Sequence, residues 1–329
     1  NPVGYDVPGM SYVKDGKTLI AGFKTIDGRD TATLYIVDRA GNIVWEWLYR
    51  DHEEEYKARG IADFQNTASW VGPNKWYESD PVRYAAFHPD NIIIDGRETN
   101  IIFIIDKKSG KVVWKVGPYY DESPELKKLG WIIGQHHAHM IPRGLPGEGN
   151  ILVYDNGGWA GYGAPNPAAP MGVKNATRDW SRILEFDPTT LKLVWSYTPH
   201  DAGFVEPLDA NRFYSPFISS AQRLPNGNTL ITEGSDGRLL EVTPEHEIVW
   251  EFINPHMDNR NMNMVYRAYR VPYEWVPQAP HPEHVEIRPL NVHEWRVPGA
   301  APLGPQEVMK VEGTIGYYAE AGTCVGTTD

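Results

Sequence analysis

Cysteine is nearly missing from this chain, since Cys324 is the only one among 329 residues. No internal disulfide can form, and zinc sites built from several cysteines are excluded. Long apolar runs are missing too: no 18 consecutive apolar residues occur, so no helical membrane span is expected. Basic residues are outnumbered, 31 against 43 acidic ones, and the net charge of −12 disfavours nucleic acid as a partner.

Several common catalytic signatures are also absent. The sequence contains no phosphate-binding G-x-x-x-x-G-K-[ST] loop and no strand-linked G-x-G-x-x-G. It contains neither H-E-x-x-H nor G-x-S-x-G. We therefore expect no bound cofactor and no metal site of a known motif.

What the sequence does contain is a repeat. Four segments place an acidic or polar turn before a short apolar run that ends in tryptophan: residues 36–47, 104–116, 185–197 and 241–252. Equivalent positions in them are held by Trp45, Trp114, Trp195 and Trp250. Upstream of each lies a second unit rich in strand-forming residues, at 16–23, 99–106, 149–158 and 227–234.

Each repeat predicts an antiparallel meander of three or four strands. One such sheet cannot bury both of its faces, whereas copies stacked around an axis can. We predict an all-β fold, a six-bladed β-propeller with long loop insertions, in which each repeated tryptophan packs between blades.

The same reading sets the expected domain organisation. We expect one propeller domain over residues 1–329, with a poorly patterned segment from about 279 to 329. Residues 48–97 and 255–320 show no clear copy of the repeat, and residues 157–181, rich in Gly, Pro and Ala, predict a long functional loop. Short helices are expected at 51–64 and 122–130.

The densest cluster of reactive side chains is the segment GQHHAHMIP, residues 134–142. It holds three of the 11 histidines, His136, His137 and His139. On a strand, alternation puts His137 and His139 on one face and His136 on the other, whereas a turn leading into a strand would let all three converge. Histidine suits acid–base, nucleophilic or metal chemistry near neutral pH.

Other polar residues are candidates for contacts with a substrate. Asn156 lies in a tight turn at a strand end, and Tyr214 begins a hydroxyl-rich segment. Arg267 and Arg270 are three positions apart, so on a strand only one of them faces inward. Arginine suits a sulfate or phosphate group, and His88 is a further candidate for the channel.

Residues 87–278 resemble the arylsulfotransferase family of β-propellers, in particular the bacterial aryl-sulfate sulfotransferases. The resemblance is carried by GQHHAHMIPRGLPGEGNILVYDNGG, SRILEFDPTTLKLVWSY, FYSPFISSAQRLPNGNTLITEGSDGRLLEVTPEHEIVWEF and VYRAYRVPYEWVP. It implies a six-bladed propeller that is secreted to the periplasm or outside the cell. It also implies transfer of a sulfuryl group from a phenolic sulfate to a phenol, without a nucleotide donor and through a sulfohistidine.

The resemblance also implies roles for individual residues. His136 and His139 match the histidines of the family's central segment, and Arg267 or Arg270 matches the sulfuryl clamp. Two departures stand out: His137 and Ala138 replace an acidic residue and a proline, and no histidine precedes Gln222. The implied partner is a small phenolic or sulfated molecule, and the sequence is silent on the oligomeric state.

Three other readings stay open at this point. The first is a binding or structural propeller without chemistry, because a fold does not imply a function. The second is a quinone-dependent dehydrogenase, because DKKSGKVVW resembles the tryptophan-docking repeat of such propellers. The third is a metal-dependent lyase or hydrolase with His136, His137 and His139 as ligands, although three ligands on one extended segment can hardly reach one ion.

Overall fold

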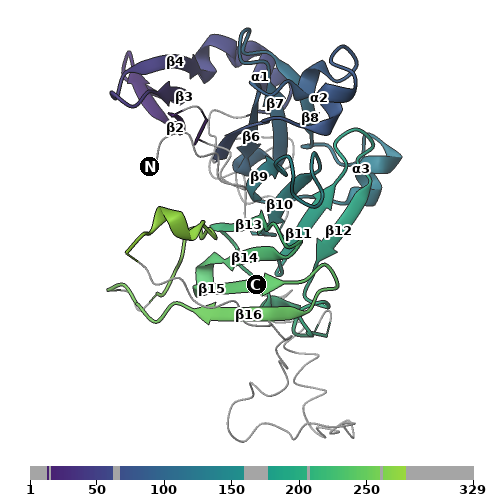
Figure 1. Cartoon of the computed structure of the whole chain (residues 1–329). Coiled ribbons are helices and arrows are strands. Elements are labelled where there is room, and N and C mark those ends of the chain that lie inside the picture. Colours follow the sequence, from purple (N-terminus) through teal and green to yellow (C-terminus); the bar gives the residue numbers. More distant parts are fainter. Residues whose placement is uncertain are drawn as a thin grey trace, which may run out of the picture. The chain divides into compact units, whose positions relative to one another are not determined.

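The computed structural model describes residues 13–14, 16–61, 67–158, 177–205, 208–259 and 262–278. They form four antiparallel sheets of four strands each, joined by loops and short helices (Figure 1). They belong to the first of two compact units, Asn1–Pro289, while the second, Leu290–Asp329, lies outside the described residues, as does segment 279–329. The all-β prediction is confirmed and the arrangement is propeller-like; the count of six blades and the single domain stay predictions.

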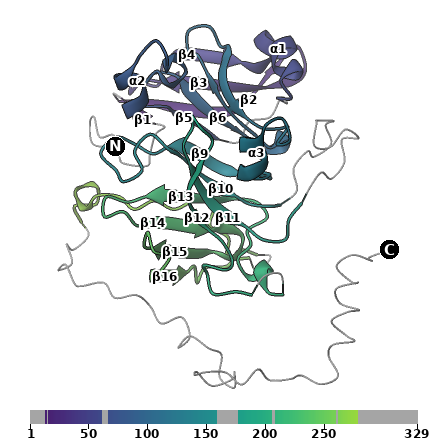
Figure 2. The same ribbon diagram turned by 90° about the vertical axis from the view of Figure 1, so that its right-hand side faces the viewer.

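The sheets follow one another along the chain, and each strand pairs with the next one in sequence. The first sheet contains β1 (Val13–Lys14), β2 (Lys17–Ile26), β3 (Arg29–Val37) and β4 (Ile43–Leu48). The second contains β5 (Thr67–Trp70), β6 (Ile92–Gly96), β7 (Ile101–Ile105) and β8 (Val112–Val116). The third contains β9 (His136–Met140), β10 (Ile151–Asp155), β11 (Arg182–Phe186) and β12 (Leu193–Tyr197). The fourth contains β13 (Ser219–Arg223), β14 (Thr229–Glu233), β15 (Arg238–Val242) and β16 (Ile248–Ile253), which Figure 2 shows in this order.

Helices are few and short in this part of the chain. The α-helices are α1 (Glu53–Ala58), α2 (Lys75–Ser79) and α3 (Pro124–Leu129), and the 3-10 turns are η1 (Tyr49–His52), η2 (Ala85–Phe87), η3 (Arg97–Thr99), η4 (Ala210–Arg212), η5 (Gly234–Asp236) and η6 (Tyr273–Trp275). The helices predicted within 51–64 and 122–130 are confirmed as α1 and α3. Ser123 caps α3 by accepting the Leu126 N–H at 3.1 Å. No helix in the described ranges is long and apolar enough to cross a membrane.

The core is divided between the faces of neighbouring sheets. All five residues of β7 are buried. Ile101, Phe103 and Ile105 belong to the core shared with the first sheet, whereas Ile102 and Ile104 belong to the core shared with the third. A strand covered on both faces is apolar throughout instead of alternating, because both faces exclude water. The inner strands also touch across the sheets, since β2 contacts β5, β6 contacts β9 and β10 contacts β13.

The repeated tryptophans link each sheet to the next. The indole N–H of Trp45 donates to the Lys107 carbonyl at 3.3 Å, that of Trp114 to Pro188 at 2.9 Å, and that of Trp195 to Pro244 at 2.9 Å. Each acceptor lies just after the third strand of the following sheet. The predicted packing of these three tryptophans between sheets is confirmed. Trp250, the fourth, has the Arg270 guanidinium 5.1 Å from its ring centroid.

The second sheet departs from the repeat as the sequence shows it. Residues 48–97, in which no clear copy was visible, contain β5 and β6, the first two strands of this sheet. The unit at 99–106 contains the third strand of its sheet, whereas the three units taken as its equivalents contain second strands. The pattern was obscured because β5 is only four residues long and fully buried, and because 71–91 insert α2 and η2 before β6. Of the predicted loop 157–181, residues 159–176 lie outside the described residues.

Candidate active site

Strand β9 carries the three neighbouring histidines and is not a regular strand. His136 pairs with Tyr154 and His139 with Leu152, so His137 and Ala138 together face the single residue between them. This is a β-bulge, and φ of His137 is +57°, in the left-handed region that side chains other than glycine rarely adopt. Such backbone strain costs on the order of 1–3 kcal/mol and concentrates at functional sites.

The bulge holds His137 and His139 against each other. Their ring centroids are 4.3 Å apart, as expected for neighbours on one face. His139 Nδ1 lies 2.8 Å from the His137 carbonyl oxygen. Because a carbonyl only accepts, the ring proton of His139 is on Nδ1 and its Nε2 carries a lone pair. His139 Nε2 is buried and has no hydrogen-bond partner among the described residues.

His136 is held in a different way. Its Nδ1 lies 2.8 Å from Asn156 Oδ1, and its Nε2 accepts the Ile218 N–H at 3.3 Å. Asn156 Nδ2 in turn donates to the Ser215 carbonyl at 2.6 Å. Both ring nitrogens of His136 are therefore occupied, and the predicted site residue Asn156 lies beside His136 as its partner.

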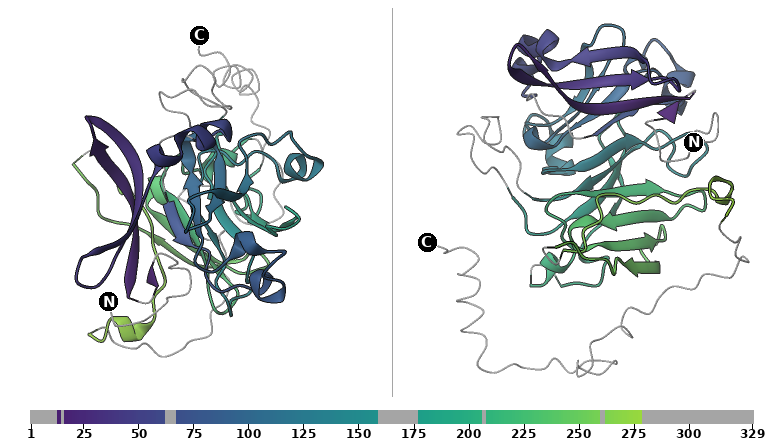
Figure 3. Two further views of the ribbon diagram at one scale, coloured as in Figure 1. Left: turned by 90° about the horizontal axis from the view of Figure 1, so that it is seen from above. Right: turned by 90° about the vertical axis from the view of Figure 1, so that its left-hand side faces the viewer.

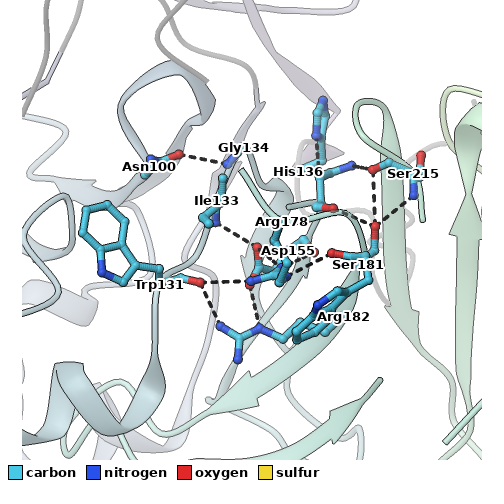
Figure 4. Close-up of polar contacts among 12 residues, drawn as sticks. Asn100, Trp131, Ile133, Gly134, His136, Asp155, Arg178, Ser181, Arg182 and Ser215 are labelled. Atoms are coloured by element: carbon cyan, nitrogen blue, oxygen red, sulfur yellow. Dashed lines mark hydrogen bonds and ion pairs between the residues drawn. The ribbon is translucent and has the colours of Figure 1, made fainter. Parts of the chain in front are cut away.

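A buried ionic network supports the chain where it enters β9 (Figure 4). Asp155 is fully buried and accepts the Ile133 N–H at 2.8 Å, Arg182 Nε at 2.7 Å and Arg178 Nη2 at 2.9 Å. Burial pushes the pKa of Asp155 upward, but the two guanidinium charges outweigh it and the pKa lies below its usual value. Gly134 N–H donates to Asn100 Oδ1 at 2.9 Å. These bonds fix the start of β9 against β10 of its own sheet and against Asn100, which precedes β7 of the second sheet.

A segment beyond the last strand, residues 265–270, brings two further side chains to the histidines. Arg267 Nη2 donates to Thr67 Oγ1 of β5 at 3.0 Å, and its Nη1 donates to Tyr269 Oη at 3.3 Å. Tyr269 Oη lies 3.1 Å from His137 Nε2, with the two rings edge to face. The same segment is anchored by Gln222, whose amide pairs with both backbone groups of Arg270. Figure 3 shows it in yellow-green beside the fourth sheet.

The two candidate arginines have different partners, although residues 267–270 do not form the strand on which the prediction of alternation was based. Arg267 lies with the histidines, while Arg270 Nη2 pairs with Glu241 Oε2 at 2.6 Å and its guanidinium lies over Trp250. Of these two arginines, Arg267 is the one whose charge acts on both His137 and His139.

The electrostatics of the site keep the imidazoles neutral. Burial lowers the pKa of His136 to about 3 and that of His139 to about 4, and the positive charge of Arg267 acts in the same direction. Burial likewise places the pKa of His137 well below its usual value. A neutral imidazole next to a guanidinium combines a nucleophile with a receptor for an anion.

Asp95 supports the bulge from the second sheet. Its carboxylate is fully buried and accepts Gln135 Nε2 at 2.8 Å and the Ala138 N–H at 3.3 Å. Burial raises the pKa of Asp95 to about 7, against the opposing charges of Arg267 and Arg97. The Ala138 N–H lies within the bulge, so Asp95 stabilises the backbone that brings His137 and His139 together.

Sequence reasoning missed Asp95, Thr67, Gln135 and Tyr269, although a signal for two of them exists. Four segments share an alanine followed by two residues, an apolar residue and then proline or glycine; the alanines are Ala68, Ala138, Ala221 and Ala268. The residues flanking these alanines are Thr67 and Ser69, His137 and His139, Ser220 and Gln222, and Arg267 and Tyr269. Aligning the four segments would have marked Thr67 and Tyr269 as equivalents of the histidines.

Two predicted residues, His88 and Tyr214, have other contacts. His88 accepts the Asp90 N–H at 3.0 Å, packs against Tyr77 and lines a separate cavity of about 510 Å³ with Trp45. It precedes the Ile92 end of β6, whereas Asp95 lies toward the other end. Tyr214 is half-buried, and its backbone N–H donates to Glu233 Oε1 at 2.8 Å. Among the described residues, no three His, Cys, Asp or Glu side chains are grouped as metal ligands would be.

Comparison with known proteins identifies the family of this chain. The family described as Arylsulfotransferase (ASST) matches residues 10–269. No curated protein matches the chain. A solved protein of unknown function from Bacteroides caccae is 13% identical with a TM-score of 0.33, covering 74% of this chain, which spans only 62% of that protein. The family match takes in every site residue from Thr67 to Tyr269, and the chain belongs to the arylsulfotransferase family.

Proposed function

We propose that this protein is a nucleotide-independent aryl-sulfate sulfotransferase with His139 as its nucleophile. The observation that carries the proposal is a set of buried polar atoms without partners among the described residues: His139 Nε2, His137 Nδ1 and Arg267 Nε. Leaving such a group unpaired costs about 1–3 kcal/mol. A bound anion would satisfy the two donors, His137 Nδ1 and Arg267 Nε, while His139 Nε2 presents the lone pair of a nucleophile. The three side chains are linked through Tyr269 and through the contact between the two rings.

The chemistry takes two steps. In the first, the lone pair of His139 Nε2 attacks the sulfur of a phenolic sulfate, the bond from sulfur to the aryl oxygen breaks, and the sulfuryl group is carried on Nε2. In the second, the oxygen of an acceptor phenol attacks the sulfur, the bond from nitrogen to sulfur breaks, and neutral His139 returns. The free Nε of Arg267 is the donor for the sulfuryl oxygens, since guanidinium groups suit anions of this geometry.

The proposal includes finer features that the family resemblance implies. These are a propeller of six blades in one domain, a periplasmic or extracellular location, and phenols as both donor and acceptor of the sulfuryl group. The docking tryptophans that suggested a quinone-dependent dehydrogenase are accounted for here as contacts between sheets.

One alternative function, a binding or structural propeller, is also supported by an observation. His136, His137 and His139 are each at most 2% exposed, which suits a propeller that binds or supports without chemistry. The two readings differ in what they require of His139, because only the enzyme needs a free nitrogen there.

The test uses 4-nitrophenyl sulfate with phenol as acceptor. We expect release of nitrophenolate that depends on the acceptor, and, with donor alone, one added sulfuryl group on the peptide that contains His139. His139→Asn should abolish both signals, whereas His256→Asn, at an exposed histidine, should leave both unchanged. No release by the wild-type protein would overturn the sulfotransferase, and transfer that survives in His139→Asn would overturn the assignment of the nucleophile.

A further inference from the structure

The proposed reaction leaves one proton to be placed. A phenolate departs in the first step, and a phenol must lose its proton in the second, so an acid–base group is needed near the aryl oxygen. Burial lowers the pKa values of the three histidines, so near neutral pH their rings are neutral, have no imidazolium proton to give and are weak bases. Asp95 has both carboxylate oxygens engaged, one by Gln135 and one by the Ala138 N–H.

Tyr269 is placed where such a group is required. Its hydroxyl lies 3.3 Å from Arg267 Nη1 and 3.1 Å from His137 Nε2, at the junction between the anion receptor and the histidine pair. The guanidinium can only donate, so the hydroxyl accepts from it, and we assign the hydroxyl proton to the bond with His137 Nε2. Tyr269 is only partly buried, unlike the histidines, so a substrate can reach it.

We propose that Tyr269 is the acid–base group of both half-reactions, an inference that rests on the proposed sulfotransferase function. As the bond from sulfur to the aryl oxygen breaks, the Tyr269 hydroxyl gives its proton to that oxygen, and a tyrosinate remains beside the Arg267 guanidinium. In the second half-reaction the tyrosinate takes the proton of the acceptor phenol while the phenol oxygen attacks the sulfur. Protons and charge balance over the cycle without any further reactant.

The chemistry of the substrate favours a tyrosine in this role. Leaving group and acid are both phenols, with pKa values of about 10 for the free side chain, so proton transfer between them is close to balanced. The adjacent guanidinium stabilises the tyrosinate while it exists, because it is a fixed positive charge at hydrogen-bond distance.

The test compares two donors in the Tyr269→Phe variant. With phenyl sulfate, whose phenolate is a poor leaving group, we expect a loss of about 100-fold or more in the rate of sulfuryl transfer to His139. With 4-nitrophenyl sulfate, whose leaving group needs little protonation, we expect a loss below about threefold. Tyr119→Phe, at a tyrosine that is 46% exposed, is the matched control and should leave both rates unchanged.

The outcomes separate the two proposals. An equal loss for both donors, or no loss for either, overturns the role of Tyr269 while leaving sulfuryl transfer intact. Absence of transfer in the wild-type protein overturns the function itself. The pH profile gives a second measurement: the wild-type rate with phenyl sulfate should fall at alkaline pH as the tyrosine ionises, and this limb should vanish in Tyr269→Phe. If the rate of the variant still falls at alkaline pH, the proposal is overturned.

Discussion

Strands β9 and β13 hold equivalent positions in neighbouring sheets but have different local structures. Strand β13 pairs with β14 residue for residue, without a bulge. Its polar side chains find partners: Ser220 Oγ donates to Thr232 Oγ1 at 3.0 Å, and Gln222 pairs with the Arg270 backbone. Strand β9 instead contains the bulge at His137, and His137 Nδ1 and His139 Nε2 have no partner within the part of the chain that the structure describes.

The difference shows how one scaffold position serves two purposes. On β13 the side chains next to the alanine hold segment 265–270 in place, and that segment delivers Arg267 and Tyr269 to β9. On β9 each histidine next to the alanine has one ring nitrogen without a partner among the residues described, and the backbone at His137 is strained. Such features persist only where the surroundings over-determine them, and here Asp95, Asp155 and the buried strands provide that support.

The largest expected effect comes from making β9 resemble β13. The double variant His137→Ser with His139→Gln carries the residues of β13 at the matching positions. We expect sulfuryl transfer to fall by at least about a thousandfold, because the nucleophile is gone. The free energy of unfolding in urea should change by no more than about 2 kcal/mol, because the bulge backbone remains. A variant that does not fold would show that the imidazoles themselves hold the strand together.

The second prediction concerns how the stability contributed by each of the two regions depends on pH. In β9, burial lowers the pKa of His139 from 6.5 to about 4, so the folded state binds fewer protons than the unfolded one in this range. Stability from this group is present above pH 6.5 and is lost as the pH falls toward 4, with a slope of at most about 1.4 kcal/mol per pH unit. Beside β13, burial raises the pKa of Glu233 from 4.5 to about 7, and its contribution has the opposite sign: it is present below pH 4.5 and is lost as the pH rises through 7.

Urea unfolding between pH 4 and 8 measures both contributions. His139→Gln should reduce the loss of stability on the acid side, and Glu233→Gln should reduce the loss toward neutral pH. If both variants shift the profile in the same direction, the opposite protonation of the two regions is wrong.

The smallest expected effect concerns the tryptophans between sheets. Trp114→Phe removes the indole bond to the Pro188 carbonyl and should lower the free energy of unfolding by about 1 kcal/mol more than Trp250→Phe. Trp250 has no carbonyl acceptor of this kind among the described residues, and its ring instead contacts Arg270. Equal losses in the two variants would show that packing of the indole ring, rather than the hydrogen bond, stabilises the contact between sheets.

Much of the fold could be predicted from the sequence because its signals are local. Turn residues such as Asp106 and Asp187 accept backbone N–H groups from the residues that follow them, within one short segment. Strand composition and the repeated tryptophan are likewise visible within about fifteen residues. Sheet two was misread where insertions broke this local pattern, at β5 and β6.

The sequence by itself determined that the chain forms antiparallel sheets linked by tryptophans, and that three histidines lie within four positions of one another. Only the tertiary structure decided that a bulge separates His136 from the other two, that Asp95 holds the backbone of this bulge, and that Tyr269 contacts His137. The physical reason is one of range: alternation and turn chemistry act between adjacent residues, whereas Tyr269 and His137 are 132 positions apart and meet only after the sheets have packed.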